Sequence, residues 1–118
     1  QEIKLDGVII VSTPQEIALQ DVKRGIAMFD KLGVNIIGLI DNMSHFIGDD
    51  KKKYAIFGEG GVKKTAEEFN KNFLGEIPIY SEIGKEGDKG KPIVESIPHH
   101  EASKTYIQLA ERIKSNFF

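Results

Sequence analysis

The chain has 118 residues, of which 40% are hydrophobic and 29% are charged, and its formal net charge is −2. These values are typical of a single globular domain over residues 1–118, and they exclude a strongly basic nucleic-acid-binding protein. The sequence contains no cysteine, which excludes disulfides and any iron–sulfur or zinc–thiolate ligation by this chain. No signal-peptide pattern opens this sequence, and no apolar run approaches the roughly 20 residues that cross a membrane, so we expect a cytoplasmic protein without membrane contact.

The first predicted strand lies in "LDGVIIVSTP", where residues 8–11 are four consecutive β-branched residues. Such a run is typical of a parallel strand that is covered on both faces. The next letters, "TPQE", predict the start of a helix. Thr13 is the expected N-cap, Pro14 lies in the first turn, and Glu16 completes a capping box.

The helix after this start is predicted to end at Gly33, because glycine readily adopts the left-handed conformation that stops a helix. Its apolar positions recur at helical spacing and are Ala18, Val22, Gly25, Ile26, Phe29 and Leu32. A second apolar strand, "VNIIGLID", then gives way at residues 41–43 to a polar loop. We interpret the lysine run at residues 51–53 of this loop as solvated.

The glycine cluster "GEGGVKKT" begins at Gly58 and approaches the phosphate-loop pattern G-x-x-x-x-G-K-[ST]. In that pattern backbone N–H groups wrap the phosphates, and the second glycine leaves room for them. Here Lys63 occupies the position of the second glycine. We therefore interpret the cluster as a turn that starts a helix at Val62, with Ala66 and Phe69 on the apolar face of that helix.

A third strand, "NFLGEIPI", is predicted to end at Pro78, and residues 81–98 are expected to form an irregular surface segment. The apolar face of the last helix comprises Ala102, Tyr106, Leu109, Ala110, Ile113 and Phe117. The order β-α-β-α-β-loop-α predicts an α/β fold, with a parallel sheet and flanking helices. In such sheets ligands bind at the carboxyl ends of the strands.

The adjacent His99 and His100 point in different directions on a helix, so we expect no metal site there.

Several motifs occur together in one order: "VSTPQ", "NMS-F", "IFG-GG", "FLGEIP" and "GKPIVES". In this order they resemble the carboxyl-terminal half of Mrp/ApbC-type iron–sulfur cluster carriers, which are ATPases related to the MinD/ParA P-loop family. The resemblance covers nearly all of the chain. It implies part of a three-layer α/β/α P-loop NTPase fold, in a protein that binds ATP with Mg and hydrolyses ATP during iron–sulfur cluster assembly or transfer. It also implies a homodimer, with iron–sulfur acceptor proteins as partners.

The resemblance further implies where a nucleotide is bound. The Walker A loop and the "D-PPGTGD" segment of the family lie upstream of the matched part and are absent from this sequence, so we expect no hydrolysis by this chain alone. The adenine pocket of the family corresponds to Asn42 with Met43 and to the segment Ile77, Pro78 and Ile79. An asparagine amide offers one donor and one acceptor, which match the N6 and N7 edge of adenine, and the apolar segment offers a wall beside the ring.

Other interpretations of these residues stay open. Asn42 at a strand end also suits a bond to its own turn, and Ile77 and Pro78 equally suit packing. Two departures from the family pattern matter as well. Many members carry a C-x-x-C between "NMS" and "FG", where a cluster bridges two subunits, whereas "HFIGDDKKKYAIFG" has no cysteine. Tyr80 stands where members more often have aspartate, which weakens the expectation of a polar nucleotide contact at this position.

Two other classes of protein are alternatives to this family. A non-enzymatic α/β dimerisation or interaction module would use an exposed sheet edge to pair with another chain. A receiver-like domain needs clustered acidic residues at the strand ends, and only Asp41 meets that requirement.

Overall fold

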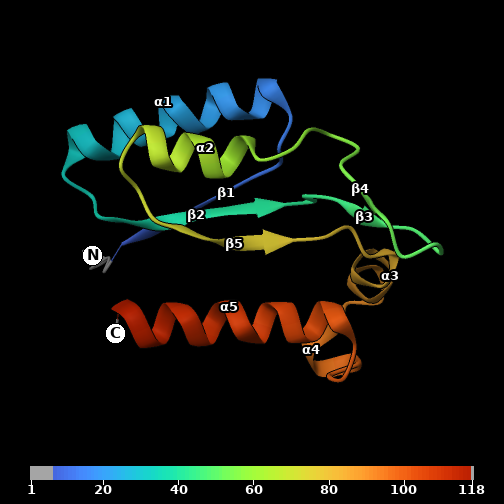
Figure 1. Ribbon diagram of the computed structural model, residues 1–118. Helices are drawn as coiled ribbons and strands as arrows, with labels where there is room; N and C mark the ends of the chain where they lie inside the picture. The colour runs from blue at the N-terminus through green and yellow to red at the C-terminus, as the bar shows by residue number, and fades with distance from the viewer. Residues whose placement is uncertain (1–6, 118) are drawn as a thin grey trace.

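The computed structural model describes residues 7–117, without the side chains of residues 81, 82, 84 and 117. Its main sheet consists of parallel strands in the order β1 (Val8–Ser12), β2 (Ile36–Asn42) and β5 (Phe73–Ile77). Helices α1 (Glu16–Leu32) and α2 (Gly61–Glu68) cover one face, and α5 (Glu101–Phe117) covers the other (Figure 1). The predicted α/β parallel sheet with flanking helices is therefore confirmed. The first letters of the predicted first strand, residues 5 and 6, lie outside the described residues.

Strand β2 is the centre of the molecule, and apolar cores lie on both of its faces. The core on the α1 and α2 side contains Val22, Ile26, Ile36, Leu39, Val62 and Ala66. The core on the α5 side contains Ile37, Ile40, Leu74, Ile77 and Leu109. A strand buried on both faces requires a nearly continuous apolar run, which is what "NIIGLI" supplies.

The sheet contains two bulges. The register skips Ile37 between β1 and β2, and it skips Leu74 between β2 and β5. An extra residue of this kind is left out of the ladder of hydrogen bonds. Side chains satisfy both carbonyls, because Asn72 Nδ2 donates to Ile37 O at 3.2 Å and Arg112 Nη1 donates to Leu74 O at 2.6 Å.

The start of α1 differs from the prediction. The helix begins at Glu16 after an extended Gln15, and no side chain caps it, so the predicted capping box is wrong. The Thr13 hydroxyl donates instead to the Gln15 side chain at 3.2 Å. The predicted stop is confirmed, since Gly33 has a left-handed φ of 71°. Leu32 does not join the apolar face, because it lies in the last turn and is 67% exposed.

Strand β1 is covered on one face only, contrary to the prediction. Val8 and Ile10 pack against the core under α1, whereas Ile9 is 36% exposed and Val11 is 56% exposed. The reason is topological: β1 is an edge strand of the described sheet, and α5 lies against β5 on the opposite edge.

Residues 81–98 are not irregular, because they contain α3 (Ser81–Asp88) and α4 (Ile93–Ser96). The glycines and charged residues of this segment obscured both short helices. Helix α4 is tied to α5, because Ser103 Oγ lies within hydrogen-bonding distance of Ile93 O (2.9 Å) and Ile97 O (2.6 Å), and α3 packs against α4. The face of α5 is confirmed at Ala102, Tyr106, Leu109 and Ile113. Ala110 is exposed, and the side chain of Phe117 lies outside the described residues.

The glycine cluster starts α2, as predicted, and packs it closely against the start of α1. Gly60 precedes the helix with a left-handed φ of 71°. A Cβ atom at Gly58 would lie 2.9 Å from the Pro14 carbonyl oxygen, and one at Gly61 would lie 2.6 Å from Leu19 Cδ1. Close approach of two segments thus accounts for Gly58 and Gly61.

Replacing Arg112 by methionine is expected to lower the free energy of unfolding by about 1 kcal/mol, because the Leu74 carbonyl loses its partner while the apolar stem is kept. Chemical denaturation would measure this change. Arg24→Met is the matched control, since the Arg24 side chain is 76% exposed and its ion pair is with the similarly exposed Asp21. Equal effects of the two substitutions would show that the Arg112 bond contributes nothing.

Candidate functional site

The carboxyl ends of β2 and β5 bring the predicted site residues together. Asn42 is paired with Ile77 in the sheet. Beyond the strands, Ser44 N donates to Ile77 O at 3.1 Å and Ile79 N donates to His45 O at 2.7 Å. Residues 42–45 and 77–79 therefore run side by side as one hydrogen-bonded rim.

The five predicted residues differ in how accessible they are. Ile77 is buried in the core on the α5 side, which favours the packing interpretation for this residue. Pro78 and Ile79 are half-buried, and Met43 is exposed with a left-handed φ of 57°. The structure thus leaves Met43, Pro78 and Ile79 as the accessible apolar residues of the rim.

Asn42 is half-buried, and its Oδ1 accepts a hydrogen bond from Met43 N at 3.1 Å. This is the bond to its own turn that the sequence left open. It holds the amide at the strand end and uses one of the two lone pairs of Oδ1. The other lone pair and both N–H groups have no partner in the described part of the chain, so the amide keeps a donor and an acceptor for a ligand.

Asp41, one residue earlier, points to the opposite face of the sheet and is only 3% exposed. Its Oδ1 has no hydrogen-bond partner among the described residues. Its neighbours across the sheet are Ser12 on β1 and Glu76 on β5. The pKa of Asp41 is raised to about 6, mainly by burial and secondarily by the charge of Glu76, while Lys53 opposes both effects.

His45 completes a polar cluster with these residues. It is buried, its Nδ1 lies 2.8 Å from Ser44 Oγ, and the same atom lies 3.9 Å from Glu76 Oε1. Lys53 Nζ is 3.4 Å from the same oxygen of Glu76. Burial lowers the pKa of His45, Lys53 lowers it further, and Glu76 opposes them. The imidazole is therefore neutral at pH 7.

Sequence reasoning did not assign a role to Asp41, His45 or Glu76. One signal was present at Asp41, because a carboxylate directly after the apolar run "NIIGLI" sits where a buried strand is still expected. No comparable signal existed for His45 and Glu76. They are 31 residues apart in the sequence, and only the pairing of β2 with β5 brings them together.

The loop after Asn42 is a small hairpin of β3 (Phe46–Ile47) and β4 (Lys53–Tyr54), which extends beyond the carboxyl end of the sheet (Figure 1). Tyr54 donates a hydrogen bond to Asp50, which lowers the pKa of that carboxyl group. Lys51 and Lys52 are exposed, in agreement with their interpretation as solvated, whereas Lys53 anchors the hairpin to Glu76. Phe46 and Ile47 of β3 are also exposed.

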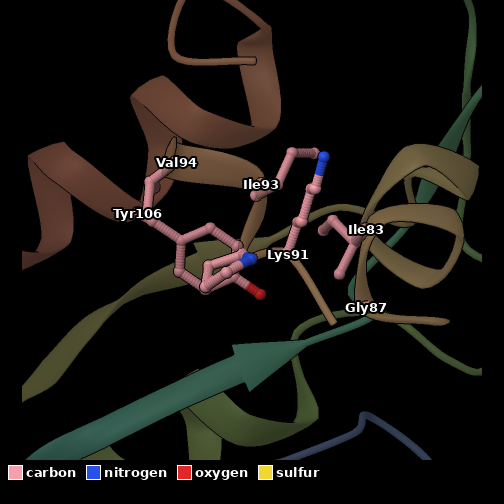
Figure 2. A pocket seen from close by; sticks show the side chains of 7 residues that line it. Ile83, Gly87, Lys91, Ile93, Val94 and Tyr106 are labelled. Atoms are coloured by element: carbon pink, nitrogen blue, oxygen red, sulfur yellow. The ribbon is translucent and has the colours of Figure 1, made fainter. Parts of the chain in front are cut away.

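A cavity of about 320 Å³ lies between α3, α4 and α5. Figure 2 shows Ile83 of α3 and Tyr106 of α5 on its walls, with Lys91 and Val94 completing the lining near α4. The cavity is mostly apolar and includes none of the five predicted residues.

Tyr80 packs edge-to-face on His100 with ring centroids 5.5 Å apart, so its ring serves packing at the base of α3.

Residues 7–117 contain neither a metal-binding cluster nor a membrane-spanning helix, as far as their side chains are described. No group of three or more histidine, aspartate or glutamate side chains is arranged to hold a metal ion. No helix in this range combines the length and the apolar character of a membrane span.

At the start of α5, His100 Nδ1 accepts a hydrogen bond from Ala102 N at 3.0 Å, which is a capping role.

Known proteins match this chain over almost its whole length. The sequence model of the ParA group that is described as NUBPL iron-transfer P-loop NTPase matches residues 1–114. The iron-sulfur cluster carrier protein of Aquifex aeolicus is 42% identical over 94% of this chain and 31% of its own length. The iron-sulfur cluster transfer protein NUBPL of Dictyostelium discoideum is 43% identical over 96% of this chain and 35% of its own length. The chain thus spans about a third of these relatives.

Solved structures show the same fold. The cell division ATPase MinD of Pyrococcus furiosus superposes with a TM-score of 0.71 over 93% of this chain and 43% of its own, at 21% identity. A nucleotide-binding protein of Archaeoglobus fulgidus, solved in complex with ADP, superposes with a TM-score of 0.63 at 33% identity, over 73% of this chain and 36% of its own. Together, the sheet order, the strand-end motifs and these matches show that the chain belongs to the NUBPL iron-transfer family of ParA-type P-loop NTPases.

Proposed function

We propose that this chain forms the adenine-binding side of an ATP-binding protein that acts in iron–sulfur cluster assembly or transfer. The observation that carries the proposal is the rim at the strand ends, where Asn42 is paired with Ile77 and residues 42–45 run alongside residues 77–79. The ADP complex of the Archaeoglobus fulgidus relative and the names of the curated relatives support it.

The donor set of the rim suits adenine. The Asn42 amide retains one acceptor lone pair and its N–H donors, so it can pair with the exocyclic amine and the N7 atom of the base. Met43, Pro78 and Ile79 offer exposed or half-buried apolar surface for the ring. A guanine base presents an acceptor where adenine presents the amine, so the Oδ1 atom of Asn42 favours adenine.

This chain supplies the base-binding side only. Its one glycine cluster starts α2, and the lysines that follow, Lys63 and Lys64, are exposed on that helix. We therefore assign phosphate and Mg binding, and with them hydrolysis, to a Walker A loop outside these 118 residues. The bound ATP supplies the free energy of phosphoryl transfer, while the residues of this chain bind and orient the base.

The remaining parts of the proposal concern cargo and assembly. This chain has no cysteine, so any iron–sulfur cluster handled by the intact protein is ligated by residues outside it. We propose that the intact protein is a cytoplasmic homodimer that delivers clusters to acceptor proteins.

Asn42→Ala is expected to weaken ADP binding about tenfold, which corresponds to the loss of about 1.4 kcal/mol of polar contact with the base. Isothermal titration would measure the affinity in a hybrid protein, in which this chain replaces the stretch that it matches in the Aquifex aeolicus relative. GDP titrated into the unsubstituted hybrid tests the preference for adenine.

Asn35→Ala is the matched control, because Asn35 is an exposed asparagine just before β2, at the far end of the same strand. It should leave the affinity for ADP unchanged. A folded hybrid that binds no ADP, or that binds ADP equally well with Asn42→Ala, would refute the proposed base site.

A further inference from the structure

Few side chains of this protein can be oxidised reversibly by a peroxide. The chain contains no cysteine and two methionines, Met28 and Met43. Hydrogen peroxide converts the thioether of methionine into a sulfoxide, and specific reductases reverse this change. Both methionines are accessible, since Met28 is 50% exposed and Met43 is 38% exposed. A reversible response of this chain to peroxide therefore acts through one of these two residues.

The two methionines lie in different parts of the molecule. Met28 belongs to α1, which begins near the carboxyl end of β1 and runs back over the sheet toward the amino ends of the strands (Figure 1). It lies twelve residues of helix, or roughly 18 Å, beyond Glu16. It comes two residues after the buried Ile26, so it faces away from the core. Met43, in contrast, lies in the rim itself, directly after Asn42.

The backbone holds Met43 in an unusual conformation. Its φ of 57° is left-handed, which is costly for a residue with a long side chain. Two hydrogen bonds fix the turn, because Met43 N donates to Asn42 Oδ1 at 3.1 Å and Ser44 N donates to Ile77 O at 3.1 Å. The turn leaves the apolar side chain of Met43 exposed at the rim, outside both cores. Strain of this kind is typical of positions that contact a ligand.

We propose that Met43 is a site of reversible oxidation, and that its oxidation weakens the binding of the base at the rim. The oxidant is hydrogen peroxide. Its O–O bond breaks, one oxygen atom is transferred to a lone pair of the Met43 sulfur, and water is released, so the sulfur is oxidised by two electrons and the peroxide is reduced. The inference rests on the proposed function, and it adds a means of regulating that site.

Oxidation changes both features of the rim that suit adenine. The thioether is apolar and polarisable and belongs to the same accessible wall as Pro78 and Ile79, whereas the sulfoxide is polar. The sulfoxide oxygen is also a hydrogen-bond acceptor, one residue away from the Asn42 amide. The N–H groups of that amide have no partner in the described part of the chain, so they can bond to the sulfoxide instead of the base. Both changes lower the affinity for an adenine nucleotide.

Peroxide treatment of the hybrid protein tests the proposal. After treatment and removal of the peroxide, peptide mass spectrometry should find the sulfoxide at Met43 and at Met28. Isothermal titration should show that ADP then binds roughly tenfold more weakly. Methionine sulfoxide reductase should restore the original affinity. Saturating ADP during the treatment should slow the oxidation of Met43 and leave that of Met28 unchanged.

Variants of the hybrid assign the effect to one residue. Each variant is compared with itself before and after peroxide, because a substitution at Met43 also alters the starting affinity. Met43→Leu has an apolar side chain that peroxide does not oxidise, so its affinity for ADP should not fall on treatment. Met28→Leu is the matched control and should stay as sensitive as the unsubstituted hybrid. The comparison also separates Met43 from any methionine of the Aquifex aeolicus portion.

An unchanged affinity after complete oxidation of Met43 would overturn the proposal, as would a fall in affinity that Met43→Leu does not prevent. In both cases the base site stands, because the untreated hybrid binds ADP. Loss of the circular dichroism signal on treatment would also overturn the proposal, since unfolding would then explain the weaker binding. A hybrid that binds no ADP before treatment would refute the base site and this inference with it.

Discussion

Asp41→Asn is expected to raise the free energy of unfolding by about 3 kcal/mol at pH 7.5. The carboxyl group of Asp41 is buried, and its pKa is raised from 3.8 to about 6, so at pH 7.5 the folded protein holds a charge that is far better solvated in the unfolded chain. A difference of about two pH units between the folded and unfolded pKa corresponds to about 3 kcal/mol. An amide of the same shape is neutral at every pH and is not repelled by Glu76.

The pH dependence identifies the cause. Between about pH 4 and pH 6 the folded protein binds more protons at Asp41 than the unfolded chain does, so its stability falls as the pH rises through this window. The advantage of Asp41→Asn should therefore shrink below about 1 kcal/mol at pH 4 and reach its full value above pH 7. Denaturant unfolding followed by circular dichroism, at several pH values between 4 and 8, would measure this difference.

His45 acts in the opposite direction but does not obscure the result. Its pKa is lowered in the folded state, so the contribution of the buried neutral imidazole is present above pH 6.5 and is lost as the pH falls. Both variants contain His45, and Asp41 is not among the causes of its lowered pKa, so this effect cancels in the difference. Asp49→Asn, at an exposed hairpin position, should change little at any pH. A constant advantage of Asp41→Asn from pH 4 to pH 8 would show that burial of the charge is not the cause.

A buried carboxylate that lowers stability invites a functional explanation, because perturbed groups of this kind concentrate at functional sites. Asp41 lies next to Asn42 in the strand, so the destabilising charge and the proposed base-binding amide share one strand end. If Asp41→Asn stabilises the protein and also weakens ADP binding in the hybrid, the charge of Asp41 contributes to nucleotide binding. If ADP binding is unchanged, the stability that the protein loses through the Asp41 charge is unrelated to the nucleotide.

The sequence was most informative where one strong local signal decided the structure. The apolar run "VNIIGLID" predicted strand β2, Gly33 ended α1, and the spacing of Ala102, Tyr106 and Leu109 predicted the buried face of α5. The same reasoning failed where tertiary contacts decide. The capping box before α1 did not form, and residues 81–98 formed two short helices, of which α4 packs against α5 and α3 packs against α4.

The residues of the candidate site also fall into those that local sequence signals predicted and those that depend on tertiary contacts. The motif around Asn42 and the segment after β5 were visible in the sequence, and their juxtaposition followed from the expected parallel sheet. The cluster of Asp41, His45 and Glu76 was not visible, because it depends on which residues face each other after two bulges shift the register. A bulge reverses the side of the sheet that each following side chain faces. No local pattern in "NIIGLIDN" or "NFLGEIP" predicts a bulge.

Gly38→Ala is expected to lower the free energy of unfolding by about 2–3 kcal/mol, because this glycine sits between the two bulges. A Cβ atom there would lie 2.6 Å from Leu74 Cγ and 2.9 Å from the backbone oxygen of Asn72. That oxygen accepts the hydrogen bond of Leu39 N at 2.8 Å, so it cannot move away without breaking a contact between β2 and β5. The added methyl group therefore pushes β5 away from the strand whose end carries Asn42.

The same substitution in α1 supplies a control of opposite sign. Gly25→Ala places its methyl group where no atom lies within 4 Å, and alanine is favoured over glycine inside a helix. In the free chain Gly25→Ala should therefore raise the free energy of unfolding by about 0.5–1 kcal/mol. Denaturant unfolding at pH 7.5 would compare the two variants. If Gly38→Ala proved neutral, β5 would be free to shift against β2, and the pairing of Asn42 with Ile77 would not be fixed by packing at Gly38.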